Sequence, residues 1–579
     1  MAGIEPATDG LRNRCSTAEL HWHHGSKRQS FREAMPCMAP NTLSCPHPRR
    51  KRKRSSTTVT ISAAHSVEGQ FRRDSCSLSY IVLTTLSGQT FMQKFMQPFW
   101  RVVLCLMPFC VLPAQARAGD IQYFRADKGV GHAVGRLPED FSAPKSLNWR
   151  VPLDGGHSTP IVEGGKIFVT TYRADSKELA TVALDQASGK MLWRNPIVPE
   201  RVEETHPIGS PATATVACDG KRVYAFFGSA GLFCYGLDGK KIWEQRMGPF
   251  RDEYGAGSSP ILFDGKIILN QDHDVDSFLI AYDCATGRQV WTTARPDAVR
   301  SYSTPGIWTN NGKPELLVAG ALQLTAYDPT NGEKNWGING LARIVIPTPV
   351  ASGGMIYMAS WAPGGDPGKR IALPTWADAL NKWDSDHDGK LAKAEIDDRD
   401  VLERFFRMDL NQDGFLSQQE WERHAAVFKR AENAVLAIKP NGRGELPESA
   451  VVWKHGRGVP YVATPVLDHG NLWMVKDGGI VTKLDAATGN LLQEERVPAV
   501  GNYFASPVAG DGKVYFASEP GTMSVVSAEK EWRVISSRDF HEKIYATPAL
   551  VGNHVYLRTE EALYCFEGTR PKITNARRN

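Results

Sequence analysis

Short apolar runs and turn residues alternate along most of this chain, and the alternation recurs with a period of roughly 40–50 residues. One repeat, Ser258–Trp291, shows the pattern clearly because Asp264-Gly265 and Asp283–Gly287 separate its apolar runs. Asp and Gly tolerate the left-handed conformations that tight hairpins need. The runs predict four short antiparallel strands, which are typical of one propeller blade. They lie at Ile261–Phe263, Ile267–Asn270, Phe278–Tyr282 and Gln289–Trp291.

A Ser-Pro or Thr-Pro pair marks the first strand of each repeat. The prolines are Pro160, Pro211, Pro260, Pro305, Pro349, Pro465, Pro507 and Pro548. A tryptophan marks most of the last strands, with one degenerate strand near Leu492. These tryptophans are Trp149, Trp193, Trp243, Trp291, Trp336, Trp453 and Trp532. Eight first strands and eight last strands indicate eight blades.

The two ends of this series predict how the ring closes. The strand Leu147–Arg150 comes before any complete repeat, whereas the final repeat, ending at Phe566, has no Trp strand of its own. We therefore expect an all-β fold, an eight-bladed β-propeller over residues 145–570 closed by an N-terminal strand. Such closure removes exposed sheet edges. The alternative is an open solenoid with frayed ends. A lead-in segment, 119–144, precedes the propeller, and a tail, 571–579, follows it.

The turn before each last strand has a recurring sequence, complete in Ala281, Asp283, Thr286, Gly287 and Trp291. Asp accepts backbone hydrogen bonds in the turn, Gly takes a positive φ, and Trp offers a flat apolar surface for packing between blades. This phrase resembles the tryptophan-docking repeat of PQQ-type propellers. That superfamily includes quinoprotein alcohol dehydrogenases and the non-enzymatic outer-membrane assembly lipoprotein BamB. The resemblance implies the fold, but it leaves catalyst and scaffold both open.

One repeat is longer than the others, and its surplus, residues 361–432 in blade five, has a helical composition. It contains two twelve-residue EF-hand loops, Asp384–Glu395 and Asp409–Glu420. Both place oxygen ligands, a mid-loop Gly and a final Glu at the spacing that Ca²⁺ requires. The expected ligands are Asp384, Asp386, Asp388, the Lys390 carbonyl and Glu395 in the first loop, and Asp409, Asn411, Asp413, the Phe415 carbonyl, Ser417 and Glu420 in the second.

The two loops are expected to act as a pair. Leu391 and Leu416 occupy the position at which paired loops make a short β contact, and Ser417 with Glu420 forms a capping box. Ala392 replaces a ligand in the first loop, so we expect the second loop to bind Ca²⁺ more tightly. Only Met408 could contribute to a Met-rich groove, which favours a structural calcium module or a binding knob over a sensor. The alternatives are an acidic loop pair without affinity and a calcium-responsive interaction protein.

The N-terminal region has the features of an export signal rather than of a fold. Residues 1–91 lack periodicity and resemble translated noncoding sequence, so we expect the true start at Met92 or Met96. Residues 92–118 then read as a signal peptide, with an apolar stretch too short to span a membrane and a small-residue cleavage site at Ala118. The alternative is an uncleaved N-terminal anchor. The expected location is periplasmic or secreted, with no transmembrane span in the mature chain.

Charge and cysteine content change once this leader is set aside. Residues 1–118 contain 16 of the 68 Lys and Arg residues and 6 of the 63 Asp and Glu residues, so the remainder is mildly acidic. This balance gives no reason to expect nucleic-acid binding. Four of the ten cysteines lie outside the leader. Cys218 and Cys234 share a blade, and both a disulfide and two thiols fit the sequence.

Two polar clusters are candidates for chemistry. Residues 270–276 contain three Asp and one His, which suit a metal or an acid/base site, although a solvated loop is the simpler reading. Residues 251–257 precede a first strand, where loops tend to face the central channel.

Quinoprotein dehydrogenases place PQQ on the propeller axis, commonly under an adjacent Cys-Cys disulfide, with Ca²⁺ and a catalytic Asp nearby. This chain has neither a Cys-Cys pair nor a Cys-x-x-Cys-His haem motif. We therefore expect an exported calcium-binding propeller that acts as a non-catalytic binding platform, assembly-factor-like or at the cell surface. Its expected cofactors are two Ca²⁺ ions, and its partner is a protein or extracellular polymer on a propeller face, bound by a monomer. The alternative is a PQQ-dependent dehydrogenase.

Overall fold

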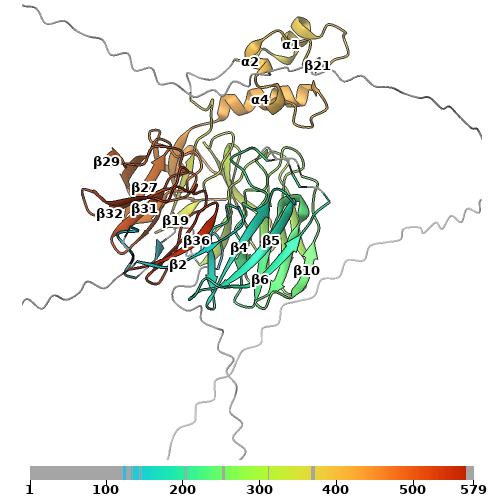
Figure 1. Ribbon diagram of the computed structural model, residues 1–579. Coiled ribbons are helices and arrows are strands. Elements are labelled where there is room, and N and C mark those ends of the chain that lie inside the picture. Colours follow the sequence, from blue (N-terminus) through green and yellow to red (C-terminus); the bar gives the residue numbers. More distant parts are fainter. Residues whose placement is uncertain are drawn as a thin grey trace, which may run out of the picture. The chain divides into compact units, whose positions relative to one another are not determined.

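The computed structural model describes residues 122–125, 132–133, 135–142, 144, 146–200, 202–203, 205–250, 254–310, 312–366 and 372–568. All of them fall within one unit of the chain, Met107–Asn579. The predicted leader, signal peptide and C-terminal tail lie outside the described residues. Figure 1 shows short antiparallel sheets arranged as a propeller, together with a group of short helices. No helix in the described ranges is long and apolar enough to cross a membrane.

The propeller has eight sheets, six of four strands and two of five. In blades one to seven the strands run from inner to outer in chain order, whereas blade eight takes its outer strand from the N-terminal side. Blades one to four contain β3 (Ile161–Glu163), β4 (Lys166–Arg173), β5 (Glu178–Asp185), β6 (Met191–Ile197); β7 (Ala217–Cys218), β8 (Arg222–Phe226), β9 (Leu232–Gly236), β10 (Lys241–Gln245); β11 (Ile261–Phe263), β12 (Lys266–Gln271), β13 (Phe278–Asp283), β14 (Gln289–Ala294); β15 (Gly306–Asn310), β16 (Lys313–Gly320), β17 (Gln323–Tyr327) and β18 (Lys334–Asn339).

Blades five to eight follow, and blades four and seven each have a fifth strand. They contain β19 (Val350–Ser352), β20 (Met355–Ser360), β23 (Ala434–Ile438), β25 (Val451–His455); β26 (Val466–Asp468), β27 (Asn471–Lys476), β28 (Ile480–Asp485), β29 (Leu491–Arg496); β30 (Val508–Gly510), β31 (Lys513–Ala517), β32 (Thr522–Ser527), β33 (Val534–Asp539); β34 (Ala549–Val551), β35 (His554–Arg558), β36 (Ala562–Glu567) and β2 (Leu147–Pro152). The extra strands are β24 (Gly444–Glu445), parallel to β18, and β1 (His132–Ala133), parallel to β30.

The eighth blade is built from both ends of the propeller region. Its outer strand, β2, precedes every other blade strand in the chain, and it pairs antiparallel with β36. The register places Trp149 opposite Cys565 and Val151 opposite Leu563. Side chains from blades one and eight then share one buried cluster, which includes Val169 and Leu563. The last sheet therefore has a partner on its outer side instead of an open edge.

An indole that packs on a glycine joins neighbouring blades. The Trp291 Nε1–H of blade three donates to the Pro329 carbonyl of blade four at 3.2 Å. The ring lies so close to Gly332 that a Cβ there would be 2.6 Å from an indole carbon. The other glycines with this contact are Gly189, Gly239, Gly287 and Gly489, under Trp149, Trp193, Trp243 and Trp453. The predicted packing of Trp between blades is confirmed at these five junctions.

Blades six and seven depart from the Trp pattern. The position opposite Lys483 in the sixth blade is held by Gln493, one residue after the expected Leu492. In the seventh blade Ser536 takes this position. Trp532 therefore lies before β33 in the turn, not in the last strand, and the prediction for it is wrong. Gln493 joins blade six to blade seven by hydrogen bonds in place of a Trp ring. Its side-chain amide donates to the Trp532 carbonyl at 3.1 Å and accepts from the Trp532 N–H at 2.8 Å.

The second blade corrects one proline marker. Elsewhere the first strand begins directly after the Ser-Pro or Thr-Pro pair, but β7 begins at Ala217, six residues beyond Pro211. Thr215 occupies the place of the repeated hydroxyl residue, because its backbone N–H and Oγ1 make the same inter-blade bonds as those of Thr159 and Ser259. Ser210-Pro211 belongs to a preceding loop. The proline is thus a frequent marker of the first strand, and the hydroxyl side chain is the constant feature.

The helical module lies between β20 and β23, the second and third strands of blade five. It contains α1 (Trp376–Trp383), β21 (Leu391–Ala392), α2 (Arg399–Leu402), α3 (Phe405–Met408), β22 (Phe415–Leu416) and α4 (Gln418–Arg430). Its core is its own, since Trp376, Trp383, Phe405 and Trp421 pack within one buried cluster. Trp361, by contrast, packs with propeller residues, so the module is narrower than the expected 361–432.

Substitution of Gly287 by Ala should destabilise the propeller more than substitution of Gly265 by Ala. Both glycines have nearly the same positive φ, +70° and +71°, so each alanine carries a similar backbone strain. A Cβ meets the Trp243 indole at Gly287 and open space at Gly265. We expect an additional loss of about 1–3 kcal/mol for Gly287→Ala, measured by urea unfolding. Equal losses in the two variants would show that the indole contact is not a close-packed joint.

Replacement of residues 367–430 by a short Gly-Ser linker should leave the propeller folded. Asn433 bonds both the N–H and the carbonyl of Ala362, at 2.9 and 3.0 Å, so the two ends of the module start side by side. Loop-closure entropy changes slowly with length, and the module has a separate core. We expect one cooperative melt within a few degrees of the parent and no calcium response. Aggregation of this variant would show instead that blade five needs the module in order to fold.

Candidate calcium loops and axial cavity

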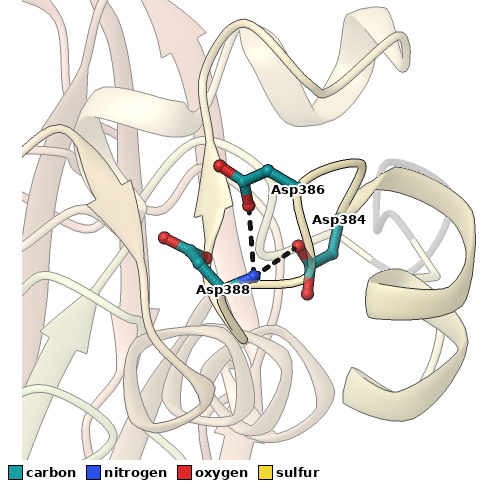
Figure 2. Close-up of side chains that lie close together, drawn as sticks. All are labelled: Asp384, Asp386 and Asp388. Carbon is teal, nitrogen blue, oxygen red and sulfur yellow. Dashed lines mark hydrogen bonds between the residues drawn. The ribbon is translucent and has the colours of Figure 1, made fainter.

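The first loop gathers three carboxylates around one point. Potential ligand oxygens of Asp384, Asp386 and Asp388 lie within 4.8 Å of one another. Figure 2 shows the Asp384 and Asp386 carboxylates accepting hydrogen bonds from the Asp388 backbone N–H, at 3.2 and 3.1 Å. Glu395 reaches the loop from its end and accepts from the N–H groups of Ser385 and Ala392, at 3.0 and 2.8 Å. These carboxylates offer several oxygen ligands around one point, the kind of ligand that Ca²⁺ prefers.

The second loop repeats this framework bond for bond. Asp409 and Asn411 both accept from the Asp413 N–H, at 3.1 and 3.0 Å. Glu420 accepts from Leu410 at 2.9 Å and from the Ser417 N–H at 2.9 Å. The predicted capping box is present, so the Ser417 hydroxyl already bonds Glu420. Glu420 and Asp409 are buried, with 8% and 7% of their surface exposed, whereas the first loop is more open.

The two loops are joined by the short β contact that their sequences predict. β21 and β22 pair antiparallel, with Leu391 opposite Leu416. Both leucines are fully buried in the module core. The loop glycines, Gly389 and Gly414, have φ of +79° and +89°, which only Gly adopts easily. The two loops therefore share the same backbone turn and pair with each other.

Local hydrogen bonds hold the carboxylates ionised. Donation from the Ala392 N–H lowers the pKa of Glu395, and donation from the Phe415 N–H lowers the pKa of Asp413. Deprotonated oxygens are the form that binds a metal ion, so neither group has to lose a proton first at neutral pH.

Glu420→Gln should weaken calcium binding more than Glu395→Gln. The second loop keeps a polar residue where the first has Ala392, and its final Glu is more buried. Loss of a carboxylate there should weaken the tighter site about tenfold or more, which corresponds to about 1.4 kcal/mol. Calorimetry on the mature chain and on both variants measures this. Absence of calcium heat in the unaltered protein would refute calcium binding, and equal effects would refute the order of affinities.

A ring of hydroxyl side chains surrounds the propeller axis. The N–H of Thr159 donates to Thr215 Oγ1 at 2.9 Å, and the N–H of Thr215 donates to Ser259 Oγ at 3.0 Å. The same bond continues from Ser259 to Thr304, from Thr348 to Thr464, from Thr464 to Ser506 and from Ser506 to Thr547. This bond thus links the innermost strands at six junctions between blades. This is the physical role of the Ser or Thr in the repeated phrase.

The residues of this ring line an axial cavity of about 170 Å³. Aromatic side chains form much of its wall. The His157 ring stacks on Tyr545 with 4.1 Å between centroids, and Tyr254 meets Tyr302 edge to face at 5.8 Å. Burial, followed by the charges of Arg558 and Lys543, lowers the pKa of His157 to about 3, so its imidazole is neutral. The cavity therefore presents rings and hydroxyls rather than charge.

Part of the lead-in segment reaches this cavity. The Gln122 carbonyl accepts from the Cys218 N–H of blade two at 2.7 Å, and Phe124 lines the cavity. The buried Arg125 donates to the carbonyls of Pro507 and Pro465, at 3.1 and 2.9 Å. Burial lowers the pKa of Arg125 to about 9, which leaves it charged at neutral pH. Nothing in the sequence pattern pointed to this segment, because four residues without periodicity carry no fold signal.

The two polar clusters predicted from the sequence, residues 270–276 and 251–257, differ in their surroundings. Asp272 is buried and receives two bonds from Arg295, at 2.6 and 2.9 Å, and Asp274 is bonded in the same way by Arg300. The expectation of a solvated loop is wrong there, and these carboxylates are committed to buried ion pairs. In the other cluster Tyr254 and Gly257 line the axial cavity, as predicted. Residues 251–253 lie outside the described part of the chain.

The cysteines in the described ranges are thiols. Cys218, Cys234, Cys284 and Cys565 are all buried, and none of these four forms a disulfide. Burial raises the pKa of Cys234 to about 12 and that of Cys284 to about 11. Since the thiolate is the reactive form, these residues behave as small apolar side chains in the blade cores. The open question about Cys218 and Cys234 is thereby settled in favour of thiols.

The chain matches the profile of the family described as outer membrane protein assembly factor BamB (PQQ_2) over residues 141–253, 177–359 and 420–570. These ranges cover more than half of the chain. The chain belongs to this family. The matched ranges leave out residues 360–419, which contain most of the helical module, so the module is an addition to the family repeat.

Curated relatives come from both branches of the superfamily. The quinohemoprotein alcohol dehydrogenase ADH IIB of Pseudomonas putida is 29% identical over 169 residues, 28% of this chain and 22% of that protein. The dehydrogenase subunit of the quinone alcohol dehydrogenase of Gluconobacter oxydans (strain 621H) is 24% identical over 208 residues, 34% and 25%. BamB of Burkholderia pseudomallei (strain K96243) is 25% identical over 134 residues, 23% and 29%. The chain thus spans less than a third of the length of each relative.

Solved structures with a similar fold include BamB from Moraxella catarrhalis and a europium-containing methanol dehydrogenase. The first has a TM-score of 0.47 at 12% identity and covers 73% of this chain and 98% of that one. The second has a TM-score of 0.49 at 11% identity and covers 78% and 98%.

The lining of the axial cavity does not fit PQQ. This cofactor carries three carboxylates, and buried carboxylates need cationic or multiple hydrogen-bonding partners. Among the described residues that line the cavity there is no Lys or Arg. Arg558, buried nearby, is directed at Ser158, with 2.5 Å to its Oγ and 3.2 Å to its carbonyl. The cavity suits an uncharged or aromatic group better than a tricarboxylate.

Proposed function

We propose that this protein is an exported, calcium-binding β-propeller of the BamB family that acts as a non-catalytic binding platform. The observation that carries the proposal is the axial cavity, whose described lining consists of aromatic, aliphatic and hydroxyl side chains without a charged group. Such a cavity can hold an uncharged ring or an apolar side chain of a partner. It lacks the convergent titratable groups that acid/base catalysis requires.

The partner proposed for this platform is a protein or an extracellular polymer. The relative from Burkholderia pseudomallei is named an outer membrane protein assembly factor, which supports a role in binding other proteins. Aromatic side chains favour such binding because they supply large contact areas at low entropic cost. The mildly acidic propeller and the signal-like segment 92–118 are consistent with a periplasmic or secreted location.

The calcium module is proposed to support this platform with two Ca²⁺ ions. Asp384, Asp386, Asp388, the Lys390 carbonyl and Glu395 would hold the first ion. The second loop would use Asp409, Asn411, Asp413, the Phe415 carbonyl and Glu420, with Ser417 securing Glu420. The module has a separate core and a fixed attachment through α4, which favours a structural role over an opening sensor.

A PQQ-dependent dehydrogenase is the second candidate. It is supported by the two quinone-dependent alcohol dehydrogenases among the relatives. If PQQ binds, its position would have to differ from the cavity described above, or the wall would have to bring Arg558 inward.

The purified mature protein should show calcium without a quinone chromophore. Absorbance after incubation with PQQ and Ca²⁺, followed by desalting, distinguishes the two candidates, and metal analysis gives the calcium content. We expect less than one-tenth of a PQQ per chain, a rough bound set by the missing cationic partners. A stoichiometric chromophore together with alcohol oxidation would overturn the platform proposal.

Tyr545→Ala, which removes one ring from the aromatic wall of the axial cavity, is expected to reduce partner binding without loss of calcium.

A further inference from the structure

Part of the lead-in segment crosses the central channel of the propeller next to the axial cavity. The Gln122 carbonyl accepts from the Cys218 N–H, which belongs to the innermost strand of blade two. Arg125 then donates to the Pro465 and Pro507 carbonyls, directly before the innermost strands of blades six and seven. In a ring of eight blades, blades two and six are opposite each other. The segment therefore reaches across the channel from one side to the other.

The same segment continues along the inner strands. β1 pairs parallel with β30 of blade seven, with His132 opposite Ala509. β1 also lies against β26 and β34, the inner strands of the blades on either side. Beyond β1, a Cβ at Gly135 would collide with the Gly552 carbonyl oxygen, so the backbone touches blade eight directly. We call the described residues 122–125 and 132–133 the axial strap.

The strap is held in place by more than one contact. Arg125 is 4% exposed, and its φ of +52° is a conformation that a non-Gly residue keeps only where its surroundings hold it. A buried guanidinium needs hydrogen-bonding partners, and the two proline carbonyls are among those that Arg125 has. Tyr123 packs against core residues of blades two and three. The strap is therefore a fixed part of the propeller rather than a loosely held end.

The cavity and the strap lie on opposite sides of the hydroxyl ring. Every blade residue that lines the cavity either belongs to the ring or precedes its ring residue in the same blade, as Tyr545 precedes Thr547. The bonds of the strap are made to residues that follow the ring, such as Cys218 and Pro507. Phe124 belongs to the strap and also lines the cavity. Its ring therefore lies at the base of the cavity, away from the loops.

The cavity has room for a single ring. Its volume of about 170 Å³ is close to that of an apolar cavity of about 150 Å³ that accepts one benzene molecule. One wall consists of three nearly parallel rings, because Tyr545 stacks with Phe504 at 5.7 Å and with His157 at 4.1 Å between centroids. Aromatic rings pack favourably against other rings. An uncharged aromatic group thus matches both the volume and the wall.

We propose that the axial strap closes the channel behind the cavity, and that the resulting blind pocket receives one aromatic side chain of a protein partner, with Phe124 at its base. This inference rests on the proposed role of the propeller as a binding platform. A pocket closed at one end admits a protruding side chain from the loop side and prevents a polymer from passing through the ring. Aromatic side chains seated in such pockets are frequent anchors of protein interfaces.

The first test measures the binding of small uncharged probes to the mature protein by ligand-observed NMR. N-acetyl-L-phenylalaninamide represents the aromatic side chain, and N-acetyl-L-leucinamide and maltotriose represent an aliphatic side chain and a sugar polymer. We expect a Kd of about 1 mM for the Phe probe, the scale that a ligand of its size reaches. The other two should bind about fivefold more weakly or less. Equal or tighter binding of either one would overturn the aromatic pocket.

Phe124→Ala should change the size preference of the pocket as well as its affinity. Removal of the base ring deepens the pocket, so N-acetyl-L-tryptophanamide should gain about tenfold relative to the Phe probe. A merely structural role of Phe124 would weaken both probes alike. Phe406→Ala is the matched control, since Phe406 is exposed in α3 and does not line the cavity. An unchanged ratio of the two affinities in Phe124→Ala would overturn the assignment of Phe124 to the base.

Arg125→Gln tests the closure by hydrogen exchange. Loss of the charged donor should loosen the strap, so the Cys218 N–H, which bonds Gln122, should exchange about tenfold faster, an opening free-energy change of about 1.4 kcal/mol. β9 of the same blade is the internal control and should be unchanged. The Phe probe should also bind more weakly, because the pocket loses its fixed base. Unchanged exchange together with unchanged probe binding would overturn the closure.

Failure of this inference is distinguishable from failure of the platform proposal. A stoichiometric quinone chromophore with alcohol oxidation would overturn the platform proposal itself. Absence of Phe-probe binding in a protein that takes up no PQQ would overturn the aromatic pocket alone.

Discussion

The contact on which this propeller depends is the indole of one blade lying flat on a glycine of the next. The glycine must be bare, because a Cβ at Gly287 would sit 2.6 Å from the Trp243 ring. The indole N–H then reaches a carbonyl of the same turn, as Trp243 does with Cys284 at 3.1 Å. Apolar packing and a hydrogen bond thus fix both the distance and the angle between blades. The joint recurs at five junctions, and a repeat protein depends on such contacts because each unit contacts only its neighbours.

Two further layers follow from that joint. At the inner strands, backbone N–H groups that donate to Ser and Thr hydroxyls tie neighbouring blades together at six junctions. At the closing blade β2 and β36 bring the two ends of the propeller together. The aromatic cavity lies beside these hydroxyl side chains, and the helical module extends one connection of blade five.

The helical module of blade five shows how an inserted segment contacts the propeller. Its core is self-contained, but α4 contacts the propeller through Arg423 and Arg430, the latter bonded to Asn339 at 2.8 Å. This contact encloses an arginine crevice, lined by Arg300 and Arg343 of the propeller and by Arg407 and Arg423 of the module.

The sequence by itself determined the features whose residues lie close together along the chain. The blade repeat, the turns of the two acidic loops and the Leu391–Leu416 contact were predictable because local sequence patterns fix each of them. Nearly all proline markers were correct, and Pro211 failed because a loop had moved the motif away from the strand. Trp532 failed because a Trp before the strand and one within it look alike in sequence.

Only the tertiary structure decided which charges are buried and which surfaces meet. Asp272 lies 23 residues from Arg295, and no local pattern could show that they pair inside the protein. The axial cavity draws its lining from residues dispersed over the whole ring, and the arginine crevice joins the module to loops more than 100 residues away, as Arg423 and Pro296 show. Burial and charge are sums over neighbours in space, and those neighbours are set by how the blades close.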